Sequence, residues 1–121
     1  MIPPVVILCG GYGKRARIIN KNLPKVLIKV GNRPFLYLLI KNLENNGVKK
    51  VYICAGYKGR LIKDYLKKNK KYFKLKILYS KENAKNLLGT GGAIKKIYNK
   101  LENIFFVMNG DSFLFLDLKK L

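Results

Sequence analysis

The stretch VVILCGGYGKR, residues 5–15, decides the fold of this chain. Residues 5–9 form an apolar run with the length and β-branched content of a buried parallel strand. Because glycine has no Cβ, the glycines within residues 10–13 allow backbone N–H groups to approach an anion closely. Arg15 and, further along the chain, Lys25 add positive charge beside them. The pattern predicts a strand that leads into a binding loop for a polyphosphate.

Other interpretations of these glycines remain open. Residues 11–16 also fit the dinucleotide fingerprint GxGxxG/A, which on its own is weak evidence. That fingerprint requires a helix at its last small residue and an acid after the next strand, whereas residues 18–24 are typical of a loop and the strand at 51–55 is followed by Gly-Tyr-Lys. The P-loop pattern GxxxxGK[ST] is absent from the sequence. A glycine turn with a purely structural role is the remaining alternative.

Strands and helices alternate along the rest of the chain. The hydrophobic patterns predict strands at 5–9, 48–55, 75–79 and 104–108, and helices at 34–46, 60–68 and 93–101. Such alternation predicts a parallel sheet with right-handed crossovers. We therefore expect one α/β domain over residues 1–121, a Rossmann-like and mostly parallel sheet with helices on both faces, truncated after the fourth strand.

Two further motifs lie at the ends of predicted elements. Asp111 follows the fourth predicted strand, at an edge where open α/β sheets bind ligands. If that strand lies beside the first, Asp111 faces the loop at 10–13 and becomes a candidate Mg²⁺ ligand, although it could instead cap a helix. The stretch LGTGGA at 88–93 permits close backbone approach to a base or sugar, or forms only a glycine-rich turn before a helix.

The chain is strongly basic, with 26 Lys and Arg against 6 Asp and Glu and a formal net charge of +20. This charge would attract nucleic acid non-specifically, so a basic nucleic-acid-binding module is the alternative function. However, most of the basic residues are scattered lysines, and the sequence contains no helix-turn-helix, zinc-ligand or RNP-like pattern. We favour a compositional bias towards AT-rich codons as the origin of the charge, and we expect no specific nucleic-acid partner.

The remaining composition indicates a cytoplasmic protein. Cys9 and Cys54 both lie in apolar, strand-like runs and are expected to be buried thiols in a reducing compartment. The chain has no His, which removes the commonest general base and metal ligand. Its N-terminal apolar run is too short for a signal peptide or a membrane span, so we expect no membrane partner.

Five motifs together resemble the sugar-nucleotide nucleotidyltransferases, also called nucleotide-sugar pyrophosphorylases. These motifs occur in the family's order: GGYGKR at 10–15 with LPK at 23–25, GNRPFL at 31–36, AGYK at 55–58, LGTGGA at 88–93 and NGDS at 109–112. Their forms look most like the branch that makes GDP-D-glycero-D-manno-heptose from heptose 1-phosphate. Mannose-1-phosphate guanylyltransferases and glucose-1-phosphate thymidylyltransferases are close relatives of that branch.

The resemblance implies that a sugar 1-phosphate oxygen attacks the α-phosphorus of a nucleoside triphosphate and releases pyrophosphate. It places the catalytic and metal roles on Arg15 at the β/γ-phosphates, on Lys25 at the reacting phosphates and on Asp111 at Mg²⁺. It places nucleotide binding on Gly10, Gly11, Gly13, Glu82, Gly89 and Thr90. Glu82 lies near the family's base-reading side chain, and residues 83–87 are interpreted as an insertion before the glycine-rich turn. A carboxylate there could accept from guanine N1–H and N2–H, which favours GTP.

The chain also departs from the family pattern. Ala16 stands where Leu is usual, Lys14 where Thr is common, and Val26 replaces the second Pro of PKP. The family's chain continues well beyond the position of Leu121, so we interpret residues 1–121 as its N-terminal, nucleotide-binding half: a fragment, a split-gene product or a decayed copy. We expect such a half to turn over poorly or not at all, and to associate with a missing C-terminal half or with itself.

Overall fold

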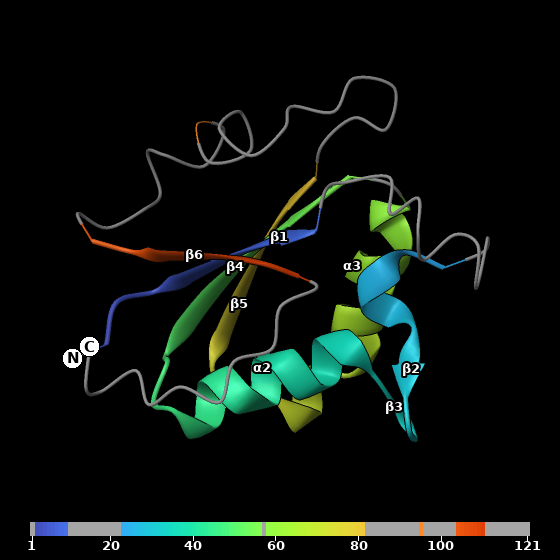
Figure 1. The fold of residues 1–121 in the computed structure, drawn as a ribbon, viewed down its shortest axis with the longest axis horizontal. Coiled ribbons are helices and arrows are strands. Elements are labelled where there is room, and N and C mark those ends of the chain that lie inside the picture. The colour runs from blue at the N-terminus through green and yellow to red at the C-terminus, as the bar shows by residue number, and fades with distance from the viewer. Residues whose placement is uncertain (1, 10–22, 57, 82–94, 96–103, 111–121) are drawn as a thin grey trace.

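Strand β1 (Val5–Cys9) lies inside a four-stranded parallel sheet in the order β5-β4-β1-β6 (Figure 1). The other strands are β4 (Lys50–Ala55), β5 (Lys76–Lys81) and β6 (Phe106–Asn109). The structure is a computed structural model, and it describes residues 2–9, 23–56, 58–81, 95 and 104–110. The order and the parallel pairing confirm the predicted α/β fold.

The predicted bounds of β1 agree with the structure, and the other strands shift by a few residues for visible reasons. Strand β4 begins at Lys50 rather than 48, because the Val48 N–H donates to the Leu43 carbonyl and closes the preceding helix. Strand β5 continues beyond 79 because it pairs with β4 as far as Ala55↔Lys81. Strand β6 is shifted towards the C-terminus because its pairing with β1 runs from Val5↔Phe106 to Leu8↔Asn109.

Helices α2 (Phe35–Asn45) and α3 (Gly59–Lys68) pack on one face of the sheet. Their apolar stripes meet the odd-numbered residues of β1 and β4. The buried residues of this layer include Ile7, Ile53, Leu36, Leu39, Ile40 and Ile62. Burial of each large aliphatic side chain contributes about 1.5–3 kcal/mol, so this layer is the main source of the domain's stability.

The opposite face of the sheet carries a smaller described cluster of Val6, Tyr52 and Cys54. Leu8, Leu78 and Phe105 are partly buried against it. The helix predicted at 93–101 lies outside the described residues, apart from Lys95, which is helical. The described part of the chain therefore shows the helices of one face of the sheet.

A short antiparallel hairpin precedes α2, and the sequence analysis did not predict it. Its strands are β2 (Lys29–Val30) and β3 (Arg33–Pro34), and Gly31 in the turn has a φ of 69°. This left-handed backbone favours glycine. The Arg33 guanidinium lies 4.6 Å from the ring centroid of Tyr37 in α2 and 5.1 Å from that of Tyr72. Tyr72 ends the 3₁₀ helix η2 (Lys70–Tyr72), so Arg33 contacts both the helix that follows the hairpin and an element distant in sequence.

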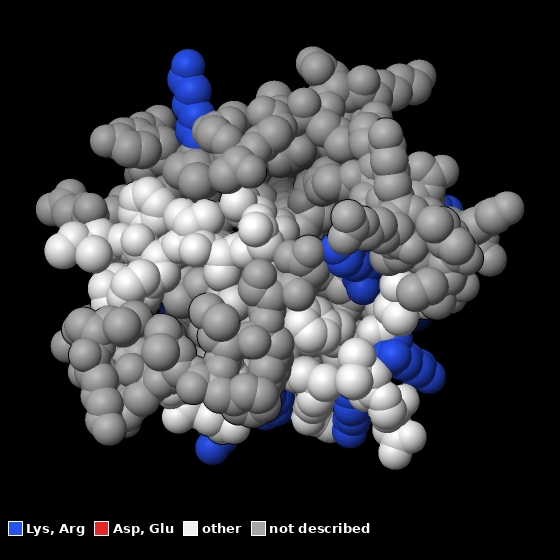
Figure 2. Space-filling model, in the orientation of Figure 1, with Lys and Arg blue, Asp and Glu red and all other residues white. Residues whose placement is uncertain are grey.

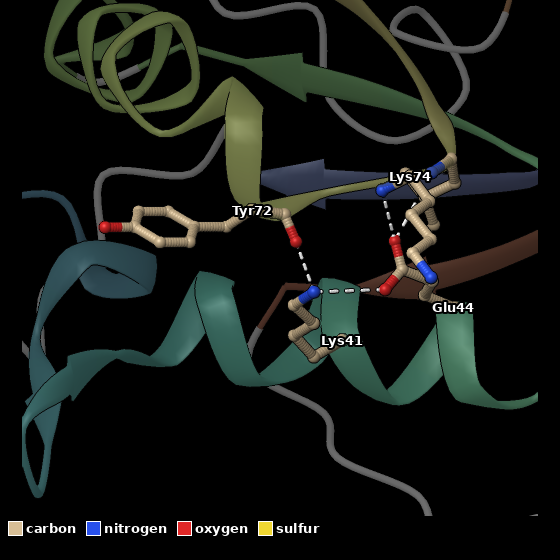
Figure 3. A network of polar contacts seen from close by, with 5 residues as sticks. Lys41, Glu44, Tyr72 and Lys74 are labelled. Atoms are coloured by element: carbon tan, nitrogen blue, oxygen red, sulfur yellow. Dashed lines mark hydrogen bonds and ion pairs between the residues drawn. The ribbon is translucent and has the colours of Figure 1, made fainter.

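A polar network joins the end of α2 to the segment that enters β5 (Figure 3). The Glu44 carboxylate accepts the backbone N–H groups of Lys74 and Leu75 and forms an ion pair with Lys41 at 3.1 Å. Lys41 also donates to the Tyr72 carbonyl. Partial burial of Glu44 opposes ionisation, but these hydrogen bonds and the Lys41 charge lower its pKa below the usual value of 4.5. The charged carboxylate therefore fixes where β5 starts.

We predict that Glu44→Gln destabilises the fold by about 1–3 kcal/mol at neutral pH, because it weakens three charge-assisted hydrogen bonds. A lowered folded-state pKa means that the contribution is fully present above the unfolded pKa and is lost as the pH falls through the folded value. Urea unfolding of both proteins between pH 7 and about pH 3 measures this. The difference should shrink below about pH 4.5. Asp64→Asn is the matched control, because Asp64 is an exposed acid on α3. An equal loss of unfolding free energy in that variant would contradict the role assigned to Glu44.

Candidate functional site

The carboxyl ends of β1 and β6 lie side by side at one edge of the sheet. Leu8 pairs with Asn109, and the Gly110 N–H donates to the Leu8 carbonyl at 2.9 Å. From β1 the chain proceeds outward to β4 and β5, whereas β6 lies on the other side of β1. The strand order therefore reverses between β1 and β6, and open α/β sheets bind their ligands in the crevice at such a point.

Gly110 allows another segment to pack tightly against this edge. A Cβ at Gly110 would lie 2.6 Å from Val26 Cγ1, closer than real Cβ contacts, and 3.0 Å from Cys9 Sγ, a tight contact. Val26 is buried and belongs to the 3₁₀ helix η1 (Lys25–Leu27). Glycine is therefore required here for space, and its contact places η1 at the junction of β1 and β6.

The backbone of Lys25 belongs to helix η1, and the side chain of Lys25 is exposed. The Leu27 N–H donates to the Pro24 carbonyl at 3.0 Å, and the Ile28 N–H donates to the Lys25 carbonyl at 3.2 Å. Proline at 24 restricts the entry to this turn, and the buried side chains of Val26 and Leu27 anchor it. The arrangement presents a Lys at the sheet edge from a rigid base.

The two cysteines lie on adjacent strands and face opposite sides of the sheet. Both are free thiols. Cys54 is buried as predicted, whereas Cys9 is only partly buried. Burial, with a smaller effect from Cys54, raises the pKa of Cys9 to about 12. Cys9 therefore remains protonated at neutral pH, and it is unsuited to act as a nucleophile although it lies beside Gly110.

The AGYK motif forms the connection from β4 into α3. The Gly59 N–H donates to the Gly56 carbonyl at 2.9 Å, and Lys58 has a left-handed φ of 50°. The Tyr79 hydroxyl donates to the Gly59 carbonyl at 2.7 Å, and burial raises the pKa of Tyr79 to about 12. This hydrogen bond links the first turn of α3 to β5, and the exposed Lys58 lies at the same edge of the sheet as the end of β4.

Of the predicted site residues, the structure describes Lys25 alone. The others lie outside the described residues: Gly10, Gly11, Gly13, Arg15, Glu82, Gly89, Thr90 and Asp111. Two of them are direct chain neighbours of described positions, because Gly10 follows Cys9 and Asp111 follows Gly110. Asp111 is predicted to face the loop at 10–13 if the fourth predicted strand lies beside the first. Strand β6 does lie beside β1.

The described residues contain neither a metal-ligand cluster nor a helix that could span a membrane. They hold no group of three or more His, Cys, Asp or Glu side chains suited to a metal ion, and the expected Mg²⁺ ligand Asp111 is not among them. None of the helices in the described part of the chain is both long enough and apolar enough to cross a bilayer.

The sequence analysis missed the contact between Gly110 and Val26. The available signal was a glycine at the end of an apolar strand and directly before a candidate metal ligand, but a sequence does not say which distant side chain fills the space beside a glycine. Val26, which replaces the second Pro of the family's PKP pattern, packs against the end of β6.

The model of the nucleotidyl transferase family matches residues 4–121 of the chain. The chain belongs to this family. The match confirms the predicted family, and it extends over both the described sheet and the segments outside the described residues.

Individual relatives support this assignment. The chain is 41% identical over 116 residues to D-glycero-alpha-D-manno-heptose 1-phosphate guanylyltransferase of Campylobacter jejuni, covering 96% of this chain and 51% of the relative. It is 36% identical over 109 residues to mannose-1-phosphate guanyltransferase of Aspergillus oryzae, covering 88% and 29%. The crystal structure of HddC from Yersinia pseudotuberculosis complexed with GMP-PN superimposes with a TM-score of 0.86 at 37% identity, covering 98% and 52%. The chain thus spans about half the length of its heptose relative.

We predict that Gly110→Ala destabilises the fold by about 1–3 kcal/mol, because the added methyl meets the stiff, β-branched Val26. Val26→Ala removes the atom that it would strike. In the Val26→Ala background the cost of Gly110→Ala should therefore fall by about 1 kcal/mol or more, measured as a urea-unfolding double-mutant cycle. Effects that add within about 0.5 kcal/mol would show that the two residues do not oppose each other.

Proposed function

We propose that this protein takes part in the transfer of a nucleotidyl group from a nucleoside triphosphate, with GTP favoured, to a heptose or hexose 1-phosphate. The products are an NDP-sugar and pyrophosphate. The observation that carries the proposal is the reversal of strand order between β1 and β6, with η1 and its exposed Lys25 packed at that point. The named activities of the heptose and mannose relatives support the substrate class.

The chemistry requires alignment and neutralisation of charge more than covalent help. The glycine loop at 10–13 continues directly from β1, so its N–H groups are proposed to bind the phosphates. Arg15 would contact the β- and γ-phosphates and Lys25 the reacting phosphates. The rigid base of η1 suits the role of Lys25, because a fixed cation stabilises developing charge without reorganisation.

Mg²⁺ is proposed to bind beyond the end of β6. Asp111 comes directly after Gly110, at the strand end that adjoins β1, and a carboxylate is a ligand that Mg²⁺ prefers. When bound there, the ion would neutralise phosphate charge. Asp111 would hold it, while Gly110 keeps η1 close enough for Lys25 to serve the same phosphates.

Base recognition is assigned to the segment after β5. Glu82 follows Lys81, the last residue of β5, and would accept from guanine N1–H and N2–H. Gly89 and Thr90 would bring backbone groups to the base. These roles rest on the family resemblance and make GTP the expected nucleotide.

We predict that Lys25→Ala and Arg15→Ala each weaken Mg-nucleotide binding by about 1.5–3 kcal/mol, the range for hydrogen bonds to charged groups. Isothermal calorimetry with GTP, ATP and dTTP measures this, and GTP should bind most tightly. Lys29→Ala is the matched control, because Lys29 is an exposed Lys in the neighbouring β2. Failure of the folded wild-type chain to bind any nucleotide at millimolar concentration would refute the proposal.

We also predict that Asp111→Asn, which keeps the shape and removes the charge, lowers pyrophosphate release on the order of a hundredfold. The assay uses Mg²⁺, each nucleotide and a panel of sugar 1-phosphates, with and without any polypeptide encoded directly downstream. Release should require a sugar 1-phosphate. A rate unchanged by Asp111→Asn would remove Asp111 from the metal site, and release without a sugar 1-phosphate would indicate a hydrolase instead.

A further inference from the structure

A hollow of about 510 Å³ lies between α3, η2 and β5, away from the β1–β6 edge. Its apolar lining consists of Leu66, Phe73, Leu75, Ile77 and Tyr79. Leu66, Phe73 and Leu75 are themselves largely buried, so they form a firm floor. The volume is within the range of sites that take up a ligand or a few side chains of a partner.

Five lysines line the same hollow: Lys63, Lys67, Lys70, Lys74 and Lys76. None of them forms an ion pair with another described residue, and Lys63 lies 6.0 Å above the Tyr79 ring. Two described acids lie near the hollow: the charge of Asp64 contributes to the raised pKa of Tyr79, and Glu44 accepts the backbone N–H groups of Lys74 and Leu75. The hollow combines an apolar floor with five lysines, which suits an occupant that is both acidic and apolar. The excess of basic side chains is also seen on the face shown in Figure 2, where described Lys and Arg side chains are visible and no described acidic side chain is.

The hollow is bordered by an end strand of the sheet. Strand β5 pairs with β4 and has no second strand partner among the described residues. Its six residues, Lys76–Lys81, offer backbone N–H and C=O groups along the outer edge. Such an edge can accept an extended peptide as an added strand, whose alternate side chains then enter the adjoining pocket.

The aromatic residues argue against a nucleic acid at this place. Single-stranded nucleic acids stack their bases on exposed aromatic faces. Phe73 is buried, 5.6 Å from Tyr37 between ring centroids, with the Lys41 ammonium 5.6 Å from its own centroid. The Tyr79 hydroxyl is bonded to Gly59 and Lys63 lies over its ring. The lysines could attract phosphates, but the floor offers bases no free platform.

We propose that the β5 edge and its lysine-lined hollow bind an extended acidic peptide segment of a partner protein. The segment pairs with β5 through its backbone, its carboxylates meet Lys67 and Lys70, and an apolar side chain between them enters the hollow. This site is separate from the proposed nucleotide site and does not depend on it.

The test is fluorescence anisotropy with the full chain and a labelled peptide of about eight residues, long enough to cover β5. Every second residue is Glu or Val, and Thr occupies the positions between. At about 150 mM salt, Lys67→Glu/Lys70→Glu should weaken binding at least about tenfold. Lys29→Glu/Lys49→Glu, which changes the net charge equally at two exposed lysines outside the hollow, should weaken it less than about threefold. Circular dichroism checks that both variants fold.

A second peptide with the same side chains, N-methylated at every backbone amide, separates backbone pairing from charge. It should bind at least about tenfold more weakly, since it cannot donate to β5 in either strand direction. Equal losses in the two double variants, or equal binding of the methylated peptide, would overturn the proposal. Absence of peptide binding, or tighter lysine-dependent binding of single-stranded DNA or of anionic phosphatidylserine vesicles, would overturn it as well.

Discussion

The position of β1 between β4 and β6 is the constraint on which the rest of this structure depends. Val5, Val6 and Ile7 are almost fully buried, so β1 needs a packed layer on each side and a strand at each edge. Helices α2 and α3 pack on one face of the sheet, and the strand order runs from β1 to β4 and β5 on one side and to β6 on the other. The crevice at the ends of β1 and β6 is a consequence of this reversal.

The close contact between Gly110 at the end of β6 and Val26 of η1 links the fold to the candidate site. Helix η1 is one turn long and cannot hold its own position, because a single turn gains few hydrogen bonds. Its buried Val26 fits against Gly110, which itself bonds to β1. The same contact therefore closes the sheet edge and sets where Lys25 is presented. Fold stability and site geometry are coupled through one glycine.

The chain has only 6 acidic residues and a formal net charge of +20, so few carboxylates are available to pair with its basic residues. Glu44 is used as a structural anchor, where it binds the backbone at the entry to β5 and the side chain of Lys41. Five of the 26 basic residues, Lys63, Lys67, Lys70, Lys74 and Lys76, line the β5 hollow and form no ion pair with another described residue. Part of the excess positive charge therefore lies at a surface away from the β1–β6 edge.

Local pattern in the sequence determined the parallel sheet, the bounds of β1, the two described helices and the family. These follow from side-chain periodicity and from motifs that are contiguous in the chain. Only the tertiary structure decided the start of β4, the β2–β3 hairpin, the Glu44 network and the contact between Gly110 and Val26. The Glu44 network and the contact between Gly110 and Val26 depend on partners far away in sequence. The start of β4 and the hairpin depend instead on backbone pairing between residues a few positions apart, which side-chain periodicity does not encode. Periodicity carries information about which face of an element is buried, but none about which residue will be found opposite.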